Sequence, residues 1–113
     1  MSCLPPRLTK RALYLRAAAR GRKAARPGLV LQVLAQPDAP VRVGFTATKK
    51  LGGAVVRNRC KRRLRAAIRN AIEEAPITGC DLVLIAREAT AKRPWAQLLG
   101  DLRGALKQAG ARP

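Results

Sequence analysis

The sequence predicts an α/β protein, an α+β sandwich in which helices pack on a mixed β-sheet. Apolar runs typical of strands occur at 29–35, 41–48 and 81–86. Helical patterns occur at 9–20 and 54–75 and from residue 94 onward. The chain has 113 residues without a repeat or a low-complexity linker, which indicates one domain over residues 1–113.

The N-terminal elements are expected to be a tail, a helix and a basic loop. Residues 1–6 contain two prolines and predict a disordered tail. Residues 9–20 predict a helix, because Leu13, Tyr14 and Ala17 fall near one face, and Thr9 is suited to be its N-cap. Gly21 ends this helix, and residues 21–28 are expected to form a loop.

The two runs at 29–35 and 41–48 are expected to pair as an antiparallel hairpin around a proline-rich turn. The second run alternates, so that Val43 and Phe45 lie on one face and Arg42, Thr46 and Thr48 on the other. Two interpretations of the Arg/Thr face stay open, a solvated surface or a surface that faces a ligand. Phe45 is expected in the core.

The remaining elements are a long helix, a buried strand and a final helix, which gives the order α-β-β-α-β-α. The helix at 54–75 has an apolar stripe. Residues 81–86 are almost continuously apolar and predict a central strand covered on both faces. Pro94 is suited to the first turn of the last helix. The expected apolar stripes are Val56, Cys60, Leu64, Ala67, Ile68, Ala71 and Ile72, and then Trp95, Leu98, Leu99, Leu102 and Leu106.

The composition favours a polyanionic partner. The 24 Lys and Arg against 6 Asp and Glu give a net charge of +18, which opposes compaction unless phosphates neutralise it. Nucleic acid is therefore the leading partner. An anionic membrane surface is second, and no apolar stretch is long enough to cross a bilayer.

The sequence offers little for catalysis by the protein itself. It has no histidine for acid–base chemistry near neutral pH, and its acids do not form a paired carboxylate site. Cys3, Cys60 and Cys80 include no CxxC pair, so we expect neither a zinc site nor a disulfide framework. Cys60 lies on the apolar stripe and is expected in the core. We expect no catalytic residue and no metal ligand.

Cations at i+4 spacing on the long helix are the sharpest functional feature. Arg57, Lys61, Arg65 and Arg69 share one face, and the band contains no acid. Such like charges repel by about 0.2–0.5 kcal/mol per pair in an isolated helix, and the arrangement becomes favourable against phosphates. We therefore expect nucleic acid to bind here, although the stripe alone does not distinguish RNA from DNA.

Two neighbouring features are ambiguous. Lys49 and Lys50 precede a Gly52-Gly53 pair at the start of the helix. This loop is either a phosphate cradle or an ordinary turn, and the sequence favours neither. Asn58 could bind a base edge or a hydrated metal, but chemistry alone favours an exposed residue near the helix start.

The run at 42–65 resembles the signature of the bacterial ribonuclease P protein subunit. It reads RVGFTATKKLGGAVVRNRCKRRLR, a long and specific match that contains the RNR element at 57–59. Arg7, Leu8, Tyr14 and Gly21 resemble the first helix of that family, and residues 81–87 resemble its D-x-x-x-I-A-R strand. The resemblance implies four strands and three helices in the order αβββαβα, with a left-handed βαβ crossover. The candidate for the fourth strand is 46–50.

The resemblance also implies a function in tRNA processing. Proteins of this family bind a catalytic RNA, and the two together remove the 5′ leader of precursor tRNA in the cytoplasm. The RNA holds the magnesium ions, and we expect one protein per RNA. Residues implied to contact the RNA subunit are Lys49, Lys50, Arg57, Asn58, Arg59, Lys61, Arg62, Arg65 and Arg69. Residues implied to line a cleft for the leader are Tyr14, Val30, Gln32, Arg42, Thr46 and Thr48.

Three positions depart from the family pattern. Gly53 replaces the usual asparagine, Ala18 replaces a second aromatic on the first helix, and Gln32 replaces an aromatic found in some members. Base–aromatic stacking is worth about 1–3 kcal/mol per base, so these changes predict a weaker or differently selective grip on the leader. A general RNA-binding module and a DNA-binding helix protein are the alternative hypotheses.

Overall fold

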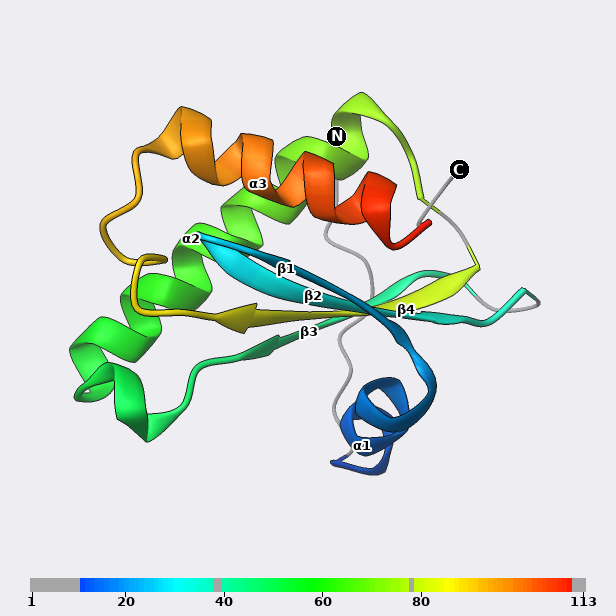
Figure 1. Cartoon of the computed structure of the whole chain (residues 1–113), viewed down its shortest axis with the longest axis horizontal. Helices are drawn as coiled ribbons and strands as arrows, with labels where there is room; N and C mark the ends of the chain where they lie inside the picture. Colours follow the sequence, from blue (N-terminus) through cyan, green and yellow to red (C-terminus); the bar gives the residue numbers. More distant parts are fainter. Residues whose placement is uncertain (1–10, 38–39, 78, 111–113) are drawn as a thin grey trace.

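The computed structural model describes residues 11–37, 40–77 and 79–110. Figure 1 shows three α-helices arranged around one β-sheet. The elements are α1 (Arg11–Arg20), β1 (Arg22–Arg26), β2 (Leu29–Ala35), β3 (Arg42–Thr46), a 3₁₀ turn η1 (Lys49–Leu51), α2 (Ala54–Glu74), β4 (Cys80–Ala86) and α3 (Trp95–Gln108). The predicted tail at 1–6 and the predicted N-cap Thr9 lie outside the described residues.

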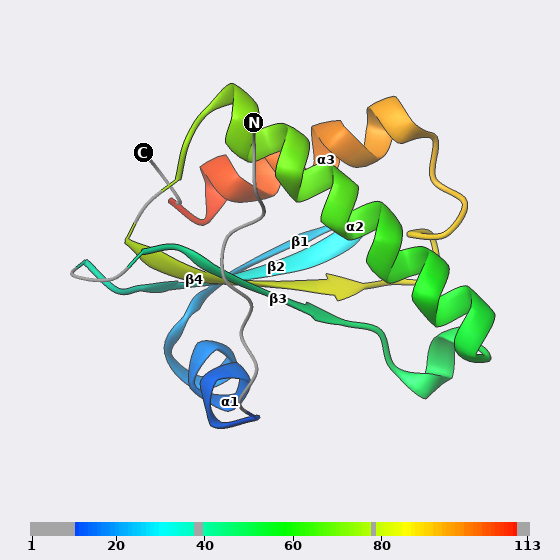
Figure 2. The same cartoon turned by 180° about the vertical axis from the view of Figure 1, so that it is seen from behind.

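The sheet has the strand order β1-β2-β4-β3. β4 pairs antiparallel with β2 and parallel with β3, so the sheet is mixed as predicted. Helices α2 and α3 cover one face and α1 covers the other (Figure 1). Seen from behind in Figure 2, α2 crosses in front of α3. The prediction of a central strand covered on both faces is therefore confirmed for β4.

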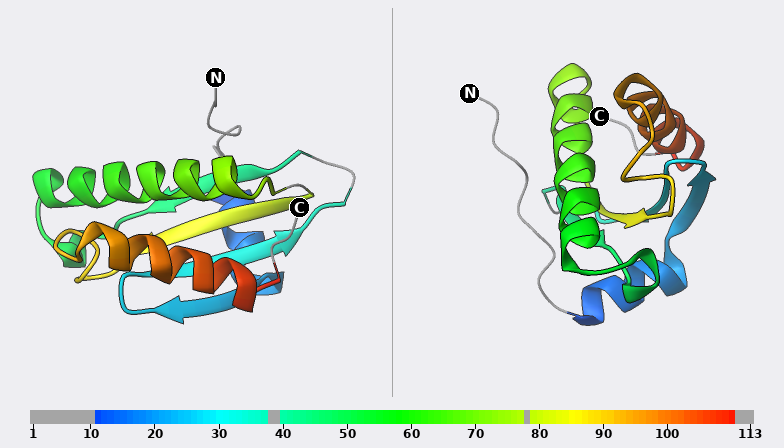
Figure 3. Two further views of the ribbon diagram at one scale, coloured as in Figure 1. Left: turned by 90° about the horizontal axis from the view of Figure 1, so that it is seen from above. Right: turned by 90° about the vertical axis from the view of Figure 1, so that its left-hand side faces the viewer.

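The crossover from β3 through α2 to β4 is left-handed. In the left view of Figure 3 the α2–α3 layer faces the viewer, β3 and β4 both run toward the left, and β4 lies below β3. A chain that travels along β3 thus returns through α2 to a strand on its left. This is the handedness implied by the resemblance, and it is the exception to the general right-handed rule.

Alternation along the strands divides the apolar side chains between two layers. Leu29, Leu31, Leu82 and Leu84 are fully buried on the α2–α3 side of the sheet. On the other side Val83 packs with Ala17 of α1. Because a fully buried leucine contributes about 1.5–3 kcal/mol, the α2–α3 layer holds most of the stabilising burial and fixes α2 against the sheet.

Three predictions about the strands are wrong. Residues 22–26 form the edge strand β1 rather than part of a loop, since Ala24 is fully buried while the flanking cations face solvent, as suits an exposed sheet edge. β2 and β3 are not a hairpin, because β4 lies between them. β4 thus pairs with a strand at each of its two edges. Residues 46–50 do not form a fourth strand, because β3 ends at Thr46 and η1 begins at Lys49.

Two expected core residues lie near the surface. Val56 is 37% exposed because it sits in the first turn of α2, beyond the edge of the sheet. Trp95 is 41% exposed at the first residue of α3, whereas Leu98, one turn later, is fully buried. Pro94 is the N-cap of α3 rather than its first residue. The other stripe residues lie in the core or against it, including Cys60.

Candidate nucleic-acid interface

Helix α2 carries seven cations before its first acid, Glu73. We call Arg57, Lys61, Arg62, Arg65 and Arg69 the cationic face of α2. Its backbone is continuous from Ala54 to Glu74, so the predicted i+4 spacing becomes a real row of side chains. The structure therefore brings together the helical residues that the sequence analysis assigned to RNA, apart from Arg59.

The cationic face borders an open hollow. The hollow has a volume of about 480 Å³ and is lined by Val55, Asn58, Lys61, Arg62 and Arg65. Asn58 is exposed and contributes an amide to this surface, while Val55 is 81% exposed and contributes an apolar group. Sequence reasoning missed Val55, and its place one turn before Asn58 was the available signal. The hollow presents three cations and no acid, which is a surface suited to phosphates.

One aromatic contact orients an arginine of this face. The guanidinium of Arg65 lies 5.6 Å from the centroid of the Phe45 ring, within the range of a cation–π interaction. Phe45 is half-buried and packs against the core, as predicted. The buried Nε atoms of Arg57 and Arg65 have no hydrogen-bond partner among the residues that the structure describes. These two N–H groups therefore make no hydrogen bond to the described part of the protein.

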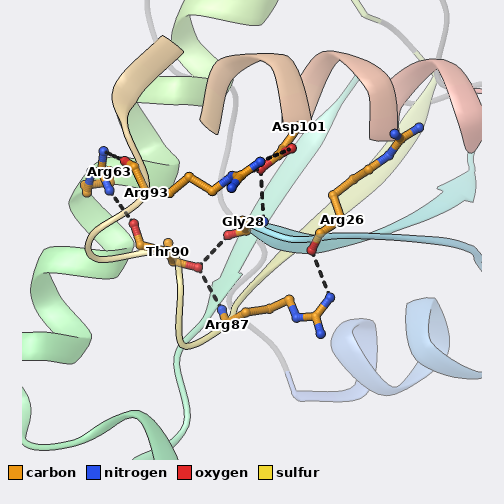
Figure 4. Close-up of polar contacts among 7 residues, drawn as sticks. All are labelled: Arg26, Gly28, Arg63, Arg87, Thr90, Arg93 and Asp101. Carbon is orange, nitrogen blue, oxygen red and sulfur yellow. Dashed lines mark hydrogen bonds and ion pairs between the residues drawn. The ribbon is translucent and has the colours of Figure 1, made fainter. Parts of the chain in front are cut away.

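Arg59 and Arg63 lie on another side of α2, toward α3. The Arg59 Nε donates to the carbonyl oxygen of Ala91 at 3.0 Å. Arg63 donates from its two Nη atoms to the carbonyl oxygens of Thr90 and Arg93 (Figure 4). These bonds tie α2 to the loop before α3. The Nε of Arg59 is thus occupied inside the protein, which sequence spacing did not reveal.

The lysine and glycine loop forms a turn with one conformational requirement. Lys49 and Lys50 are exposed on η1. Gly52 has φ of +130°, which side chains rarely tolerate, so a glycine is needed there for the turn. Gly53 is the N-cap of α2 with no side-chain cap, and a Cβ there would meet nothing within 4 Å. The turn explains Gly52, and the phosphate cradle stays a prediction.

A second surface lies on the α1 side of the sheet. The Tyr14 ring of α1 rests on Gly44 of β3, since a Cβ on Gly44 would lie 2.7 Å from three atoms of that ring. Next to it, Val30, Ile85 and Thr46 form one row across β2, β4 and β3, and all three are half-buried. The predicted leader residues therefore come from three different elements and meet on one face.

The other predicted leader residues are less accessible or more peripheral. Gln32 is only 6% exposed and lies opposite Val83 in the sheet. Thr48 is exposed beyond the end of β3. Ala18 is exposed on α1, so Tyr14 is the aromatic residue that α1 brings to this surface.

Arg42 is held by a buried carboxylate. Its Nε and Nη2 donate to the two oxygens of Asp81, each at 2.9 Å, across the parallel pair of β3 and β4. The hydrogen bond from Arg42 to Asp81 raises the pKa of Arg42, against the effect of burial. Asp81 is fully buried, while the Arg42 side chain is 30% exposed. One edge of the guanidinium is thus fixed in the fold while the side chain still reaches the α1-side surface.

The cysteines and acids of the described residues do not form a reactive centre. No group of three or more His, Cys, Asp or Glu side chains lies together within 11–37, 40–77 and 79–110. Burial raises the pKa of the Cys60 thiol, against the lowering effect of Arg63 and Arg59. Burial and the charge of Asp81 raise the pKa of Cys80 to about 11. Both thiols are free and buried, and Cys3 lies outside the described residues.

Sequence reasoning also missed a polar cluster between α3 and the turn from β1 to β2. Asp101 accepts hydrogen bonds from the Gly28 amide at 3.0 Å and from Arg93 Nε at 2.5 Å. Thr90 is fully buried, and its hydroxyl donates to the Gly28 carbonyl oxygen and accepts from the Arg87 amide (Figure 4). These contacts fix the loop before α3.

Among the described residues, no helix is long and apolar enough to span a membrane.

Comparison with known proteins identifies the family. A family model described as Ribonuclease P matches residues 5–110. A ribonuclease P protein component of Gluconacetobacter diazotrophicus is 57% identical over 107 residues, covering 94% of this chain and 92% of the relative. One of Paramagnetospirillum magneticum is 48% identical over 111 residues, covering 93% and 83%. The structure of the RNase P protein of Staphylococcus aureus is similar with a TM-score of 0.79 and 28% identity, covering 95% of this chain and 97% of that one. The chain belongs to the ribonuclease P protein family.

Proposed function

We propose that this chain is the protein subunit of a ribonuclease P ribonucleoprotein and promotes removal of the 5′ leader from precursor tRNA. The observation that carries the proposal is the cationic face of α2, whose seven-cation helix borders a hollow with three cations and no acid. The family match supplies the identity of the ribonucleoprotein. In this proposal the cationic face of α2 binds the RNA subunit.

Binding at this face is driven by phosphate contacts. Arginine and lysine neutralise phosphates and release the counterions condensed on RNA, which favours association at low salt. A rigid helix presents these groups at fixed spacing, and Arg65 is further oriented by the Phe45 ring. Lys49 and Lys50 extend the same charge from η1. A general RNA-binding module shares this electrostatics, so the choice of RNA partner rests on the family.

The α1-side surface is proposed to bind the single-stranded leader. Tyr14 offers an aromatic ring, while Val30, Ile85 and Thr46 offer a half-buried strip along the sheet. Single-stranded RNA is typically bound by stacking of its bases on aromatic side chains beside cationic groups. Arg42 is the fixed cation at this surface. Because α1 and α2 lie on opposite faces of the sheet, the two RNA contacts use separate sides of the protein (Figure 1).

The cleavage chemistry is assigned to the RNA subunit with magnesium. The described residues do not fit a protein-held metal, since they contain no cluster of three or more His, Cys, Asp or Glu. The proposed stoichiometry is one protein per RNA, and the proposed location is the cytoplasm. The protein's own contribution is binding and positioning of RNA.

The experiment tests this assignment with two double variants that change the net charge of the protein by the same amount. Lys61→Glu with Arg65→Glu reverses two charges on the cationic face of α2, and Lys23→Glu with Lys107→Glu reverses two exposed charges on β1 and α3. Fluorescence anisotropy measures binding to ribonuclease P RNA and to an unrelated RNA of equal length. We expect the first variant to lose affinity and selectivity for ribonuclease P RNA, while the second loses only general affinity. Equal losses would overturn the assignment of α2.

A further inference from the structure

Trp95 is an exposed aromatic side chain that neither RNA surface described above includes. It is the only tryptophan in the chain, and it is 41% exposed at the first residue of α3. Its spacing places it on the helix face of Leu98 and Leu102, both fully buried, but one turn beyond the end of the core. Tryptophan is enriched at interfaces because its large ring can be covered by a partner while its N–H keeps a hydrogen bond, so Trp95 is a candidate contact residue.

The position of Trp95 is fixed by the cationic helix. The loop directly before it receives three arginine hydrogen bonds from α2. Arg59 donates one to Ala91. Arg63 donates the other two, to Thr90 and Arg93 (Figure 4). Arg93 is further tied to Asp101 of α3. The backbone just before Trp95 is therefore tied to the side of α2 that carries Arg59 and Arg63.

The electrostatics around this end of α3 favour a polyanion. Arg59, whose Nε donates to the loop before α3, and Lys92 in that loop are both exposed, and the first turn of α3 contains no acid. Asp101, the acid nearest to Trp95 in sequence, is already paired with Arg93. An exposed indole among cations fits RNA, because an unpaired base stacks on the ring while neighbouring phosphates contact the cations. A protein partner would have to neutralise the same cations.

We propose that Trp95 is a stacking site for an unpaired base of the RNA subunit, on the side of α2 that carries Arg59 and Arg63. The inference rests on the proposed function, because it places the base in the RNA that α2 binds. It adds a contact on the α3 side of α2, away from the leader surface beside α1. The loop from Thr90 to Arg93, held by Arg59 and Arg63, positions this site.

The fluorescence of the single tryptophan tests the proposal directly. The full-length protein is titrated with ribonuclease P RNA, and binding is followed in parallel by the anisotropy of labelled RNA. We expect the emission of Trp95 to be quenched and its quenching by acrylamide to fall at saturation. Binding with unchanged acrylamide quenching would overturn the inference and leave the proposed function standing. An absence of selective binding would overturn both.

Variants separate stacking from simple proximity. We expect Trp95→Phe to keep the affinity for the RNA subunit within about twofold, and Trp95→Leu to lose about fivefold or more, since stacking needs an aromatic ring. Leu15→Ala, which truncates a 56% exposed side chain of α1 on the opposite face of the sheet, is the matched control and should bind unchanged. Circular dichroism and thermal melts verify that each variant folds. Equal binding by the leucine and phenylalanine variants would contradict a stacking role.

Discussion

Replacement of Gly44 by alanine is the sharpest perturbation of the α1-side surface. A Cβ at Gly44 would lie 2.7 Å from Cε1, Cζ and the hydroxyl oxygen of Tyr14. Ordinary contacts between carbon atoms are about 3.5–4.0 Å, so the ring must move away by about 1 Å or turn. The new methyl group therefore lifts Tyr14 off the sheet without changing any atom of the tyrosine.

The size of the effect follows from packing and stacking. Overpacking of a close contact costs about 1–3 kcal/mol, and part of this cost is relieved here because Tyr14 is only half-buried. Base–aromatic stacking is worth about 1–3 kcal/mol, so displacement of the ring should weaken binding of the leader by up to that amount. We expect Gly44→Ala to remain folded and to bind leader-bearing precursor about 5- to 100-fold more weakly.

The assay is a double-mutant cycle on the reconstituted ribonucleoprotein. Dissociation constants are measured for precursor tRNA with its leader and for mature tRNA, with wild type, Gly44→Ala, Tyr14→Ala and the double variant. We expect each single variant to weaken precursor binding more than mature tRNA binding, and Gly44→Ala to add nothing once Tyr14 is gone. Additive losses in the double variant would show that Gly44 does not act through Tyr14. Equal losses for precursor and mature tRNA would refute the leader surface.

Three further outcomes are expected. Arg42→Ala leaves the buried Asp81 carboxylate without its partner and should lower the free energy of unfolding, measured in urea, by about 3–5 kcal/mol. Asp81→Ala leaves a partly exposed guanidinium and should lower it by about 1–3 kcal/mol. Equal losses would contradict this asymmetry. The pKa of Cys80 rises from 9.0 to about 11 on folding, so stability should be full below pH 9 and fall by up to about 3 kcal/mol from pH 9 to 11. Cys80→Ala should flatten that decline, and a profile identical to wild type would exclude the thiol as its source. Lys61→Ala should lower the salt slope of RNA-subunit binding by about 0.7–0.9, while Lys107→Ala, a change of equal charge on α3, should not change selective binding.

The sequence predicted those elements whose pattern reflects burial. The stripe of α2 and the continuous apolar run of β4 follow from contact with the sheet or with both helix layers, so both were found at their observed places. β1 was missed because an edge strand buries only alternate small residues, here Ala24, between cations. Strand pairing was wrong because alternation reveals a strand but not its neighbour, and β4 enters the sheet from far along the chain.

The candidate site was predicted by residue type, and only the fold showed which groups are already engaged. Helical spacing separates Arg59 and Arg63 from Arg65, but it does not say which side of α2 meets the loop before α3. Gly44 lies in the middle of a strand, a position where glycine often marks close approach of another group, and the structure identifies that group as Tyr14. The partner of Arg42 could not be read from the sequence, because Asp81 comes 39 residues later.

Cleavage of precursor tRNA at low magnesium concentration addresses the central claim most directly. The reaction contains ribonuclease P RNA with or without this protein, and the protein alone serves as the control. The account predicts that the RNA with the protein cuts at the mature 5′ end, while the RNA alone is slow under these conditions and the protein alone is inactive. Tight binding of the protein to the RNA without any stimulation of cleavage at that position would contradict the account.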